Sequence, residues 1–396
     1  MTSRHAVVSG ASIAGLSAAF WLRRTGWEVT VLERAEAFRD GGQNVDVRGT
    51  AREVLARMGL TEAVKEQNTT ETGTVFVGSS GEVLAELPSA GPDGATAELE
   101  VLRGDFALTI LRHLPAGVEI LYGETISEVD EGTGGVAVTT ASGKELRAEL
   151  LVIAEGVRST TRDRLFRDLV GRRDLGIAMV FGTIPRTASD DSRWRWYTTT
   201  GGRQIHLRPD NHGTTRAMLA QARTEDLTRL DRADALRHFR DHFADAGWEA
   251  RRVLDGFDGS DDVYVDQLTQ IRMPSWHRGR VCLAGDAAWC VTPMGGGGAS
   301  LALVSGYVLA ACLSGAGRIE DGLAAYEEWM RPLVDDVQTL PRWIMPIAYP
   351  RTRFGLRLRR LADKVITSRP LAPLTAKMTQ VASSERALPP IAVAHT

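Results

Sequence analysis

The sequence has little cysteine, with Cys282, Cys290 and Cys312 as the only three among 396 residues. Three thiols are too few, and of the wrong parity, for a disulfide framework, so they favour a reducing, cytoplasmic environment. The first residues enter a strand-like run without the charged, apolar and small-residue regions of a signal peptide. We also find no apolar run of the roughly 18 residues that a membrane span needs. We therefore expect a soluble cytoplasmic protein with no membrane partner.

An excess of charge of either sign is also lacking. The 47 basic and 50 acidic residues give a net charge of −3, so no global basic field favours nucleic acid as a partner. The H-E-x-x-H spacing of zinc enzymes and a C-x-x-C pair are absent as well, and we predict no metal site. The composition, 43% hydrophobic and 24% charged, is that of a globular protein long enough for two domains.

A glycine-containing turn follows the first predicted strand. Residues 6–8 are apolar, residues 10–15 read G-A-S-I-A-G, and an amphipathic helix then runs to Gly26. In a dinucleotide-binding βαβ unit the first glycine makes the tight turn, the last lets helix and strand approach, and the helix N-terminus faces a pyrophosphate. A second strand, over 29–32, ends at Glu33. Its carboxylate could accept from ribose hydroxyls and would repel a 2′-phosphate, so this turn favours FAD or NAD.

Two further predicted strands end beside an acidic residue and a glycine. The apolar run 150–153 leads to Glu155-Gly156, and the run 281–284 leads to Gly285-Asp286. Ligands of open α/β sheets bind outside the carboxyl ends of the strands, so both acids are candidate ligand contacts. Four glycines, residues 295–298, then precede a helical pattern and could let backbone amides close on a flat ring. A flexible hinge and an N-capped turn are the alternatives without a ligand.

Taken in order, these stretches resemble the FAD-dependent aromatic hydroxylases of the para-hydroxybenzoate hydroxylase class, the group A flavoprotein monooxygenases. The tetracycline-inactivating and polyketide-tailoring members are the most similar in appearance. The resemblance covers about residues 5–340 and implies an α/β fold: a Rossmann-type, GR2-like FAD-binding domain interleaved with a β-sheet substrate domain, plus C-terminal helices. The expected FAD-binding domain comprises 1–70, 101–172 and 271–340, the substrate domain 71–100 and 173–270, and the C-terminal helical segment 341–396.

The same resemblance implies which residues contact FAD. They are Gly10, Ala11, Ser12, Ile13, Ala14, Gly15, Glu33, Arg34, Asp46, Arg103, Glu155, Asp286, Pro293, Gly295, Gly296, Gly297, Gly298 and Ala299. Arg103 is also the candidate for tuning the flavin, although an arginine at a helix start is more often solvated or paired with a neighbour such as Asp105. Glu155, Gly297 and Trp289 depart from the family's aspartate, glutamine and histidine or tyrosine, and Trp289 is expected close to the ring.

The implied function is that of an FAD-dependent monooxygenase. It would use NADPH or NADH as a transient co-substrate, and O₂, to oxygenate an aromatic or polyketide-like small molecule through a flavin C4a-hydroperoxide. The alternative is a redox-silent cyclase or isomerase that binds FAD on the same scaffold. Candidate substrate contacts are Trp196, Gln204, His206, Met218 and Met294. Ordinary sheet packing is the alternative for the tryptophans.

Two expectations concern the surface of the molecule. We expect a monomer or a weak homodimer. The segment 351–366 interleaves arginines with apolar residues, and we expect it to form a solvated amphipathic helix packed on the FAD-binding domain rather than a membrane-binding helix.

Overall fold

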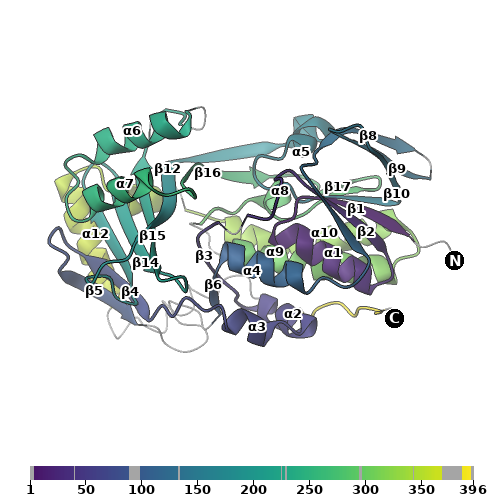
Figure 1. The fold of residues 1–396 in the computed structure, drawn as a ribbon, viewed down its shortest axis with the longest axis horizontal. Helices are drawn as coiled ribbons and strands as arrows, with labels where there is room; N and C mark the ends of the chain where they lie inside the picture. Colours follow the sequence, from purple (N-terminus) through teal and green to yellow (C-terminus); the bar gives the residue numbers. More distant parts are fainter. Residues whose placement is uncertain are drawn as a thin grey trace.

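The computed structural model describes residues 4–39, 41–88, 99–132, 134–223, 225–227, 230–293, 297–341, 343–367 and 386–393. The predicted contacts Met294, Gly295 and Gly296 lie outside the described residues. Figure 1 shows two lobes, one built on a mainly parallel sheet and one on a larger, mainly antiparallel sheet, connected by the long strands β12 (Gly171–Pro185) and β16 (Tyr264–Arg272).

The first lobe contains a six-stranded sheet in the order β17-β18-β11-β1-β2-β7. Its strands are β1 (His5–Ser9), β2 (Glu28–Glu33), β7 (Val118–Tyr122), β11 (Leu150–Ile153), β17 (His277–Arg278) and β18 (Val281–Leu283). All neighbouring pairs are parallel except β17 and β18. The carboxyl ends of β2, β1, β11 and β18 therefore meet at one edge of the sheet, as the sequence predicted for the strands that carry the candidate acids.

Helices α1 (Ile13–Arg24) and α9 (Gly298–Gly315) pack closely in this lobe. A Cβ on Gly306 would lie 2.4 Å from Ala18 N, and Ser17 Oγ donates to Leu303 O over 2.7 Å. With a mean hydropathy of 1.6, α9 is long and apolar enough to cross a membrane by length and composition, but 72% of it is buried. Our expectation that no apolar run reaches this length was therefore wrong. The burial of α9 is that of a core helix, which α1, α2 (Thr50–Met58) and α10 (Ile319–Gln338) cover.

The second lobe contains a seven-stranded sheet in the order β16-β12-β15-β14-β13-β4-β5. Its remaining strands are β4 (Gly73–Val77), β5 (Val83–Pro88), β13 (Trp194–Thr199), β14 (Arg203–Pro209) and β15 (Thr214–Ala222). Helices α6 (Arg232–Phe243) and α7 (Ala250–Asp258) cover one face, and α11 (Ile344–Ala348) with α12 (Arg353–Ile366) lies against the other. The expectation that the segment 351–366 packs on the FAD-binding domain was therefore wrong: α12 contacts the second sheet through Arg359.

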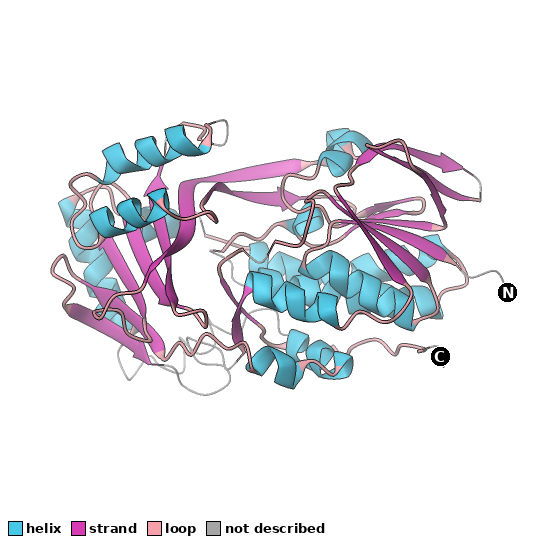
Figure 2. Ribbon diagram, viewed as in Figure 1, coloured by secondary structure: helices cyan, strands magenta, loops and turns pink. Residues whose placement is uncertain are grey.

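Shorter elements complete the structure, as Figure 2 shows by secondary structure. They are β3 (Asn44–Asp46), α3 (Thr61–Lys65), β6 (Glu100–Leu102), α4 (Arg103–Arg112), β8 (Ile126–Gly132), β9 (Gly135–Thr140), β10 (Glu145–Ala148), α5 (Thr160–Leu165), the short 3₁₀ helix Arg167–Leu169 and α8 (Asp286–Trp289). The largest buried apolar cluster belongs to the parallel-sheet lobe, and two smaller clusters lie on the two faces of the second sheet. The domain boundaries given above stay a prediction.

Candidate functional site

The turn between β1 and α1 has no room for side chains at its two glycines. Gly10 adopts φ +108°, and a Cβ there would lie 2.4 Å from Ala154 O. A Cβ on Gly15 would lie 1.8 Å from Gly10 O. The first helical bond runs from Leu16 N to Ser12 O, so the amides of the first turn have no acceptor within the helix. Ser12 is exposed beside them and forms no side-chain cap, which leaves this helix end open to a pyrophosphate.

Glu33, at the end of β2, shapes the same turn. Its Oε2 accepts from Ala11 N over 2.9 Å, and its Oε1 accepts from Ala35 N over 2.9 Å. A carboxylate offers about four lone-pair sites, so two remain for ribose hydroxyls. Arg34 is exposed next to it. The structure thus places Glu33 beside the glycine turn, where the sequence predicted a ribose contact.

Glu155, after β11, has a carboxylate that is fully engaged within the protein. Its Oε1 accepts from Ser9 Oγ and Thr161 Oγ1, each over 2.7 Å. Its Oε2 accepts from Ser159 Oγ over 2.7 Å and from Thr161 N over 3.2 Å. These four bonds use the lone pairs of both oxygens. Glu155 therefore ties β1, β11 and α5 together, and a direct contact with a cofactor stays a prediction.

Asp286 begins α8 directly beside the glycine turn. A Cβ on Gly285, whose φ is +60°, would lie 2.7 Å from the Cβ of Ala14, so the turn after β18 packs against the first turn of α1. Asp286 is exposed as a residue, but protein atoms closely surround its carboxylate. Burial raises its pKa, Arg103 opposes that effect, and Asp266 adds to it. Such a carboxylate suits a ligand that brings hydroxyl groups.

Arg103, the first residue of α4, carries a free positive charge near this edge. Its backbone N donates to Gln43 O over 2.9 Å. Its charge acts on the pKa of Tyr264, Asp266 and Asp286, so its guanidinium lies in their neighbourhood. Within the described ranges, no hydrogen bond or ion pair holds that guanidinium. Burial raises the pKa of Tyr264 to about 12.

The alternative partner for Arg103 is engaged elsewhere. Asp105 Oδ2 accepts from Asn211 Nδ2 over 3.1 Å and contacts His212 Nε2 over 3.0 Å. These bonds connect α4 to the turn after β14. Arg103 is therefore not neutralised by its neighbour and remains available to a ligand.

Asp46 lies where β3 passes the N-terminus of α9. Ser300 Oγ donates to Asp46 O over 2.9 Å and accepts from Arg48 N over 3.0 Å. Asp46 Oδ2 pairs with Arg48 over 3.1 Å, while its Oδ1 is buried without a partner among the described residues. Ser300 was not predicted as a site residue, and its only signal in the sequence was a hydroxyl in the first helical turn after the four glycines.

The loop before α9 has a positive φ at each of its described ends. Thr292 adopts φ +67°, which is rare for a β-branched residue, and such strain concentrates at functional loops. Pro293 follows it and is exposed. Gly297 caps α9 with φ +67°, and Gly298 begins the helix just before Ala299. A glutamine at position 297, the residue that the resemblance implied, would be strained with this backbone.

Aromatic and sulfur-containing side chains form a continuous row across one face of the second sheet. Directly paired positions run through Tyr264, Phe181, Met218, His206, Trp196 and Phe76. Paired residues point to the same face, and Tyr264 stacks on Phe181 with ring centroids 4.9 Å apart. The row thus begins in the neighbourhood of Arg103 and ends beneath α12. It brings together Met218, His206 and Trp196, three of the predicted substrate contacts.

The polar members of this face have internal partners. Gln204 Nε2 donates to Ala348 O over 2.7 Å, and Gln204 Oε1 lies 3.1 Å from His206 Nε2. Trp194 Nε1 donates to His206 Nδ1 over 3.1 Å, so the proton of a neutral His206 resides on Nε2. Burial, with Arg208 and Arg359 nearby, holds the pKa of His206 well below its usual range. Substrate contacts by Gln204 and His206 stay a prediction.

Trp196 differs from these two residues because its indole has an unused donor. The Nε1 atom of Trp196 is buried without a partner in the described part of the chain. The Trp196 ring lies 4.5 Å from the ring of His206 by centroids. An unpaired buried donor has a desolvation cost that a ligand oxygen can relieve.

A buried ionic cluster joins the two lobes and was not found from the sequence. Arg208 on β14 contacts Glu71 over 2.8 Å and Glu100 over 3.0 Å. Its guanidinium also lies 4.1 Å from the centre of the Trp194 ring. Asn44 Nδ2, on β3, donates to Glu100 Oε1 over 2.7 Å. Burial raises the pKa of Glu71 to about 8, with Arg208 opposing and Glu100 contributing.

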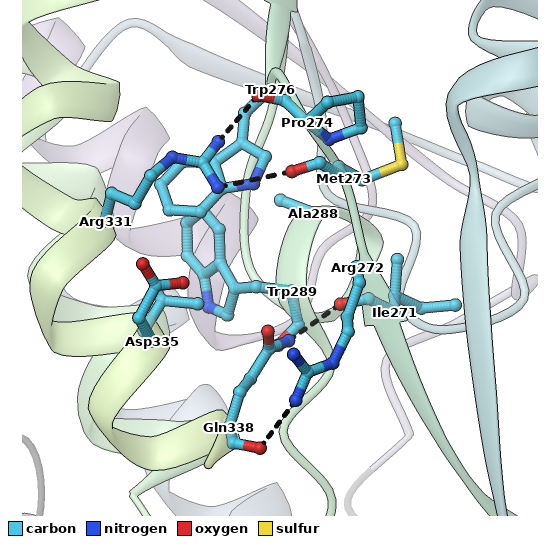
Figure 3. Close-up of a pocket in the computed structure, with 11 residues that line it drawn as sticks. Ile271, Arg272, Met273, Pro274, Trp276, Ala288, Trp289, Arg331, Asp335 and Gln338 are labelled. Atoms are coloured by element: carbon cyan, nitrogen blue, oxygen red, sulfur yellow. Dashed lines mark hydrogen bonds between the residues drawn. The ribbon is translucent and has the colours of Figure 1, made fainter.

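Trp289 lies in the hydrophobic core, where it is 1% exposed. Its ring packs 4.5 Å from that of Trp276 by centroids and 6.3 Å from that of Tyr326. Figure 3 shows it beside Arg331 and Asp335 of α10, in the wall of a hollow of about 260 Å³. Its aromatic surface is therefore used in packing α8 against α10, and its closeness to the flavin ring stays a prediction.

Comparison with known proteins gives consistent matches over most of the chain. The family described as FAD binding domain matches residues 4–339. An uncharacterised protein of Mycobacterium tuberculosis is 35% identical over 320 residues, covering 78% of this chain and 85% of its own. The flavin-dependent monooxygenase eupH of a Phoma species is 32% identical over 392 residues, covering 90% of each chain. The crystal structure of the tetracycline destructase Tet(51) superposes with a TM-score of 0.78 at 26% identity, covering 96% of this chain and 95% of its own.

Proposed function

The chain belongs to the FAD-binding family of flavin-dependent monooxygenases, and we propose that it oxygenates an aromatic or polyketide-like small molecule with NADPH or NADH as electron donor. One oxygen atom of O₂ enters the substrate and the other leaves as water, while the nicotinamide is oxidised. One observation supports this proposal most strongly. The glycine turn, Glu33, Asp286 and the unpaired Arg103 lie together at one edge of the sheet. Bound FAD supplies the hydride acceptance and the oxygen activation at its C4a carbon.

The protein's own groups would bind and orient that cofactor. The open N-terminus of α1 suits the pyrophosphate, Glu33 the adenosine ribose, and Asp286 the hydroxyls of the ribityl chain. Asp46, with its unpartnered Oδ1, is a further contact beside α9. Arg103 would stabilise negative charge on the reduced ring, because a fixed cation in a partly dry site acts more strongly than one in water.

The second sheet would hold the substrate. The row from Tyr264 to Trp196 offers flat and polarisable side chains to a planar, largely apolar molecule. The free Trp196 Nε1 could donate to a carbonyl or phenol oxygen of such a molecule. Tet(51), a tetracycline destructase, supports a polycyclic substrate. A cytoplasmic location and a monomer or weak homodimer belong to the same proposal.

The visible spectrum of the purified protein tests this function. We expect a bound-flavin spectrum that anaerobic NADPH or NADH bleaches, faster in the presence of an aromatic substrate. Air should then restore the oxidised spectrum and yield a product heavier by one oxygen atom. A flavin that binds but resists both donors, with every candidate substrate, would contradict the proposal and favour a redox-silent cyclase or isomerase. The departures at Glu155 and Gly297 motivate that second reading.

A further inference from the structure

Helix α12 presents a line of large apolar side chains to solvent. Phe354 is 77% exposed, Leu358 49%, Leu361 59% and Val365 48%. Their spacing of four, three and four residues puts them on one face of the helix. These four residues, called the apolar stripe below, extend over about 16 Å at 1.5 Å per residue. Isolated exposed leucines are ordinary, but four on one helical face form a contiguous surface that marks an interaction site.

The opposite face of α12 docks on the protein through polar groups. Arg359 Nε donates to Asp363 Oδ1 over 2.6 Å, and Asp363 is only 7% exposed. The Arg359 guanidinium lies 5.3 Å from the centre of the Trp196 ring and 5.7 Å from that of Phe76. A surface helix of a globular protein normally turns its apolar face to the core. Here two cation–π contacts of Arg359 hold the helix on the sheet, while the Arg359–Asp363 pair lies within α12 and orients that arginine. The apolar stripe faces away from the sheet.

Positive charge borders the apolar stripe. Arg353, Arg357 and Lys364 are exposed on the same helix, and its one acid, Asp363, is paired with Arg359. Glu82 on the β4–β5 turn lies within reach of this helix, since Arg360 contributes to lowering its pKa. Two copies of α12 packed stripe to stripe would bring their cations together, which disfavours self-association. The binding partner that complements this face has an apolar layer for the stripe and anionic groups beside that layer for the cations.

We propose that α12 is an interfacial helix that binds anionic phospholipid bilayers. The apolar stripe enters the boundary between headgroups and acyl chains, and the three exposed cations contact lipid phosphates. This amends the expectation of a protein without a membrane partner, because the amphipathic pattern of α12 could be read from the sequence but the face that the fold leaves exposed could not. The proposal does not depend on the reaction that the protein catalyses.

Vesicle sedimentation of the full-length, FAD-loaded protein tests this proposal. We expect binding to vesicles of phosphatidylcholine with phosphatidylglycerol, and weak binding to phosphatidylcholine alone. The double variant Leu358→Ser/Leu361→Ser should lose the bound fraction. The matched control is Leu169→Ser/Leu230→Ser, which changes two leucines that are 44% and 38% exposed elsewhere on the surface. An unchanged flavin content and melting temperature in both variants would show that they fold.

The charged flank is tested separately. Arg357→Gln/Lys364→Gln should weaken binding to phosphatidylglycerol vesicles about thirtyfold, at about 1 kcal/mol per cation, and should leave binding to phosphatidylcholine unchanged. Arg237→Gln/Arg251→Gln, on exposed positions of α6 and α7, is the control. Absence of vesicle binding at low salt would overturn the proposal, as would full binding by the serine variant. A dimer in light scattering that only Leu358→Ser/Leu361→Ser dissociates would instead assign the apolar stripe to a second copy.

Discussion

The Ser9 hydroxyl donates a hydrogen bond to Glu155 Oε1 over 2.7 Å and so joins the carboxyl ends of two neighbouring parallel strands, β1 and β11. Thr161 on α5 donates to the same oxygen over 2.7 Å. The glutamate side chain is long enough for one carboxylate oxygen to accept from both hydroxyls. Position 155 is therefore a structural junction behind the glycine turn.

We expect Glu155→Asp to lower the free energy of unfolding by about 1.5–3 kcal/mol, the contribution of a hydrogen bond to a charged group. The shorter side chain cannot keep all its partners on both strands and on α5. Urea unfolding of the FAD-loaded protein measures the effect. Glu145→Asp, at an exposed position of β10, is the matched control and should stay within about 0.5 kcal/mol of the wild type. Equal midpoints for both variants would show that the junction is dispensable.

Ser12 offers a test of cofactor binding that leaves the fold intact. Because Ser12 is exposed and forms no cap, Ser12→Glu should not change the melting temperature of the flavin-free protein. Its charge would meet the pyrophosphate at the open end of α1, and we expect FAD affinity to fall by about tenfold or more. Ser12→Gln, which has the same size without the charge, separates sterics from repulsion. Fluorescence titration with FAD measures both, and equal loss in the two variants would contradict an electrostatic origin.

The elements around the glycine turn were predictable because their constraints are local. A turn that needs Gly10 and Gly15 shows itself within six residues, and the predicted strand and helix beside it are β1 and α1. The edge of a parallel sheet then brings Glu33, Glu155 and Asp286 together by topology alone.

Contacts between distant segments were not predictable. Ser300 meets Arg48 across 252 residues of sequence, and Arg208 meets Glu71 across 137. No periodicity in either segment points to its partner, since each residue type is common on a surface. The direction of α12 was missed for a related reason: hydrophobic spacing defines an apolar face, but it does not say whether the fold covers that face.

Arg103 is expected to control the rate of flavin reduction. Arg103→Ala removes a cation that forms no ion pair or hydrogen bond in the described structure, so negative charge on the reduced ring would be less stabilised. We expect anaerobic reduction by NAD(P)H to slow by about 100-fold, the usual effect of removing one such group, with FAD retained. Stopped-flow absorbance measures it. Arg112→Ala, at an exposed position of the same helix, should be neutral, and unchanged reduction in Arg103→Ala would reject the role.

Glu71 should make stability depend on pH. Its pKa is about 8 in the fold against an ordinary 4.5, because burial favours the neutral acid more than Arg208 favours the charge. Between these values the folded protein keeps a proton that the unfolded chain has lost. The free energy of unfolding therefore falls as pH rises through this window, by at most about 1.4 kcal/mol per pH unit for one proton. The stabilisation that Glu71 contributes is fully present below the pKa that Glu71 has in the unfolded chain, and it is lost above the pKa that Glu71 has in the fold.

Glu71→Gln replaces the neutral acid by an amide that cannot titrate. We expect the variant to lose this part of the decline and to be more stable than the wild type above about pH 8, because no charge is then forced into the cluster with Glu100 and Asp46. Urea unfolding at intervals between about pH 5 and about pH 9 measures the slopes. Glu62→Gln, whose side chain is 81% exposed, should follow the wild-type curve. If Glu71→Gln also runs parallel to the wild type, Glu71 is already ionised in the fold and Arg208 outweighs burial.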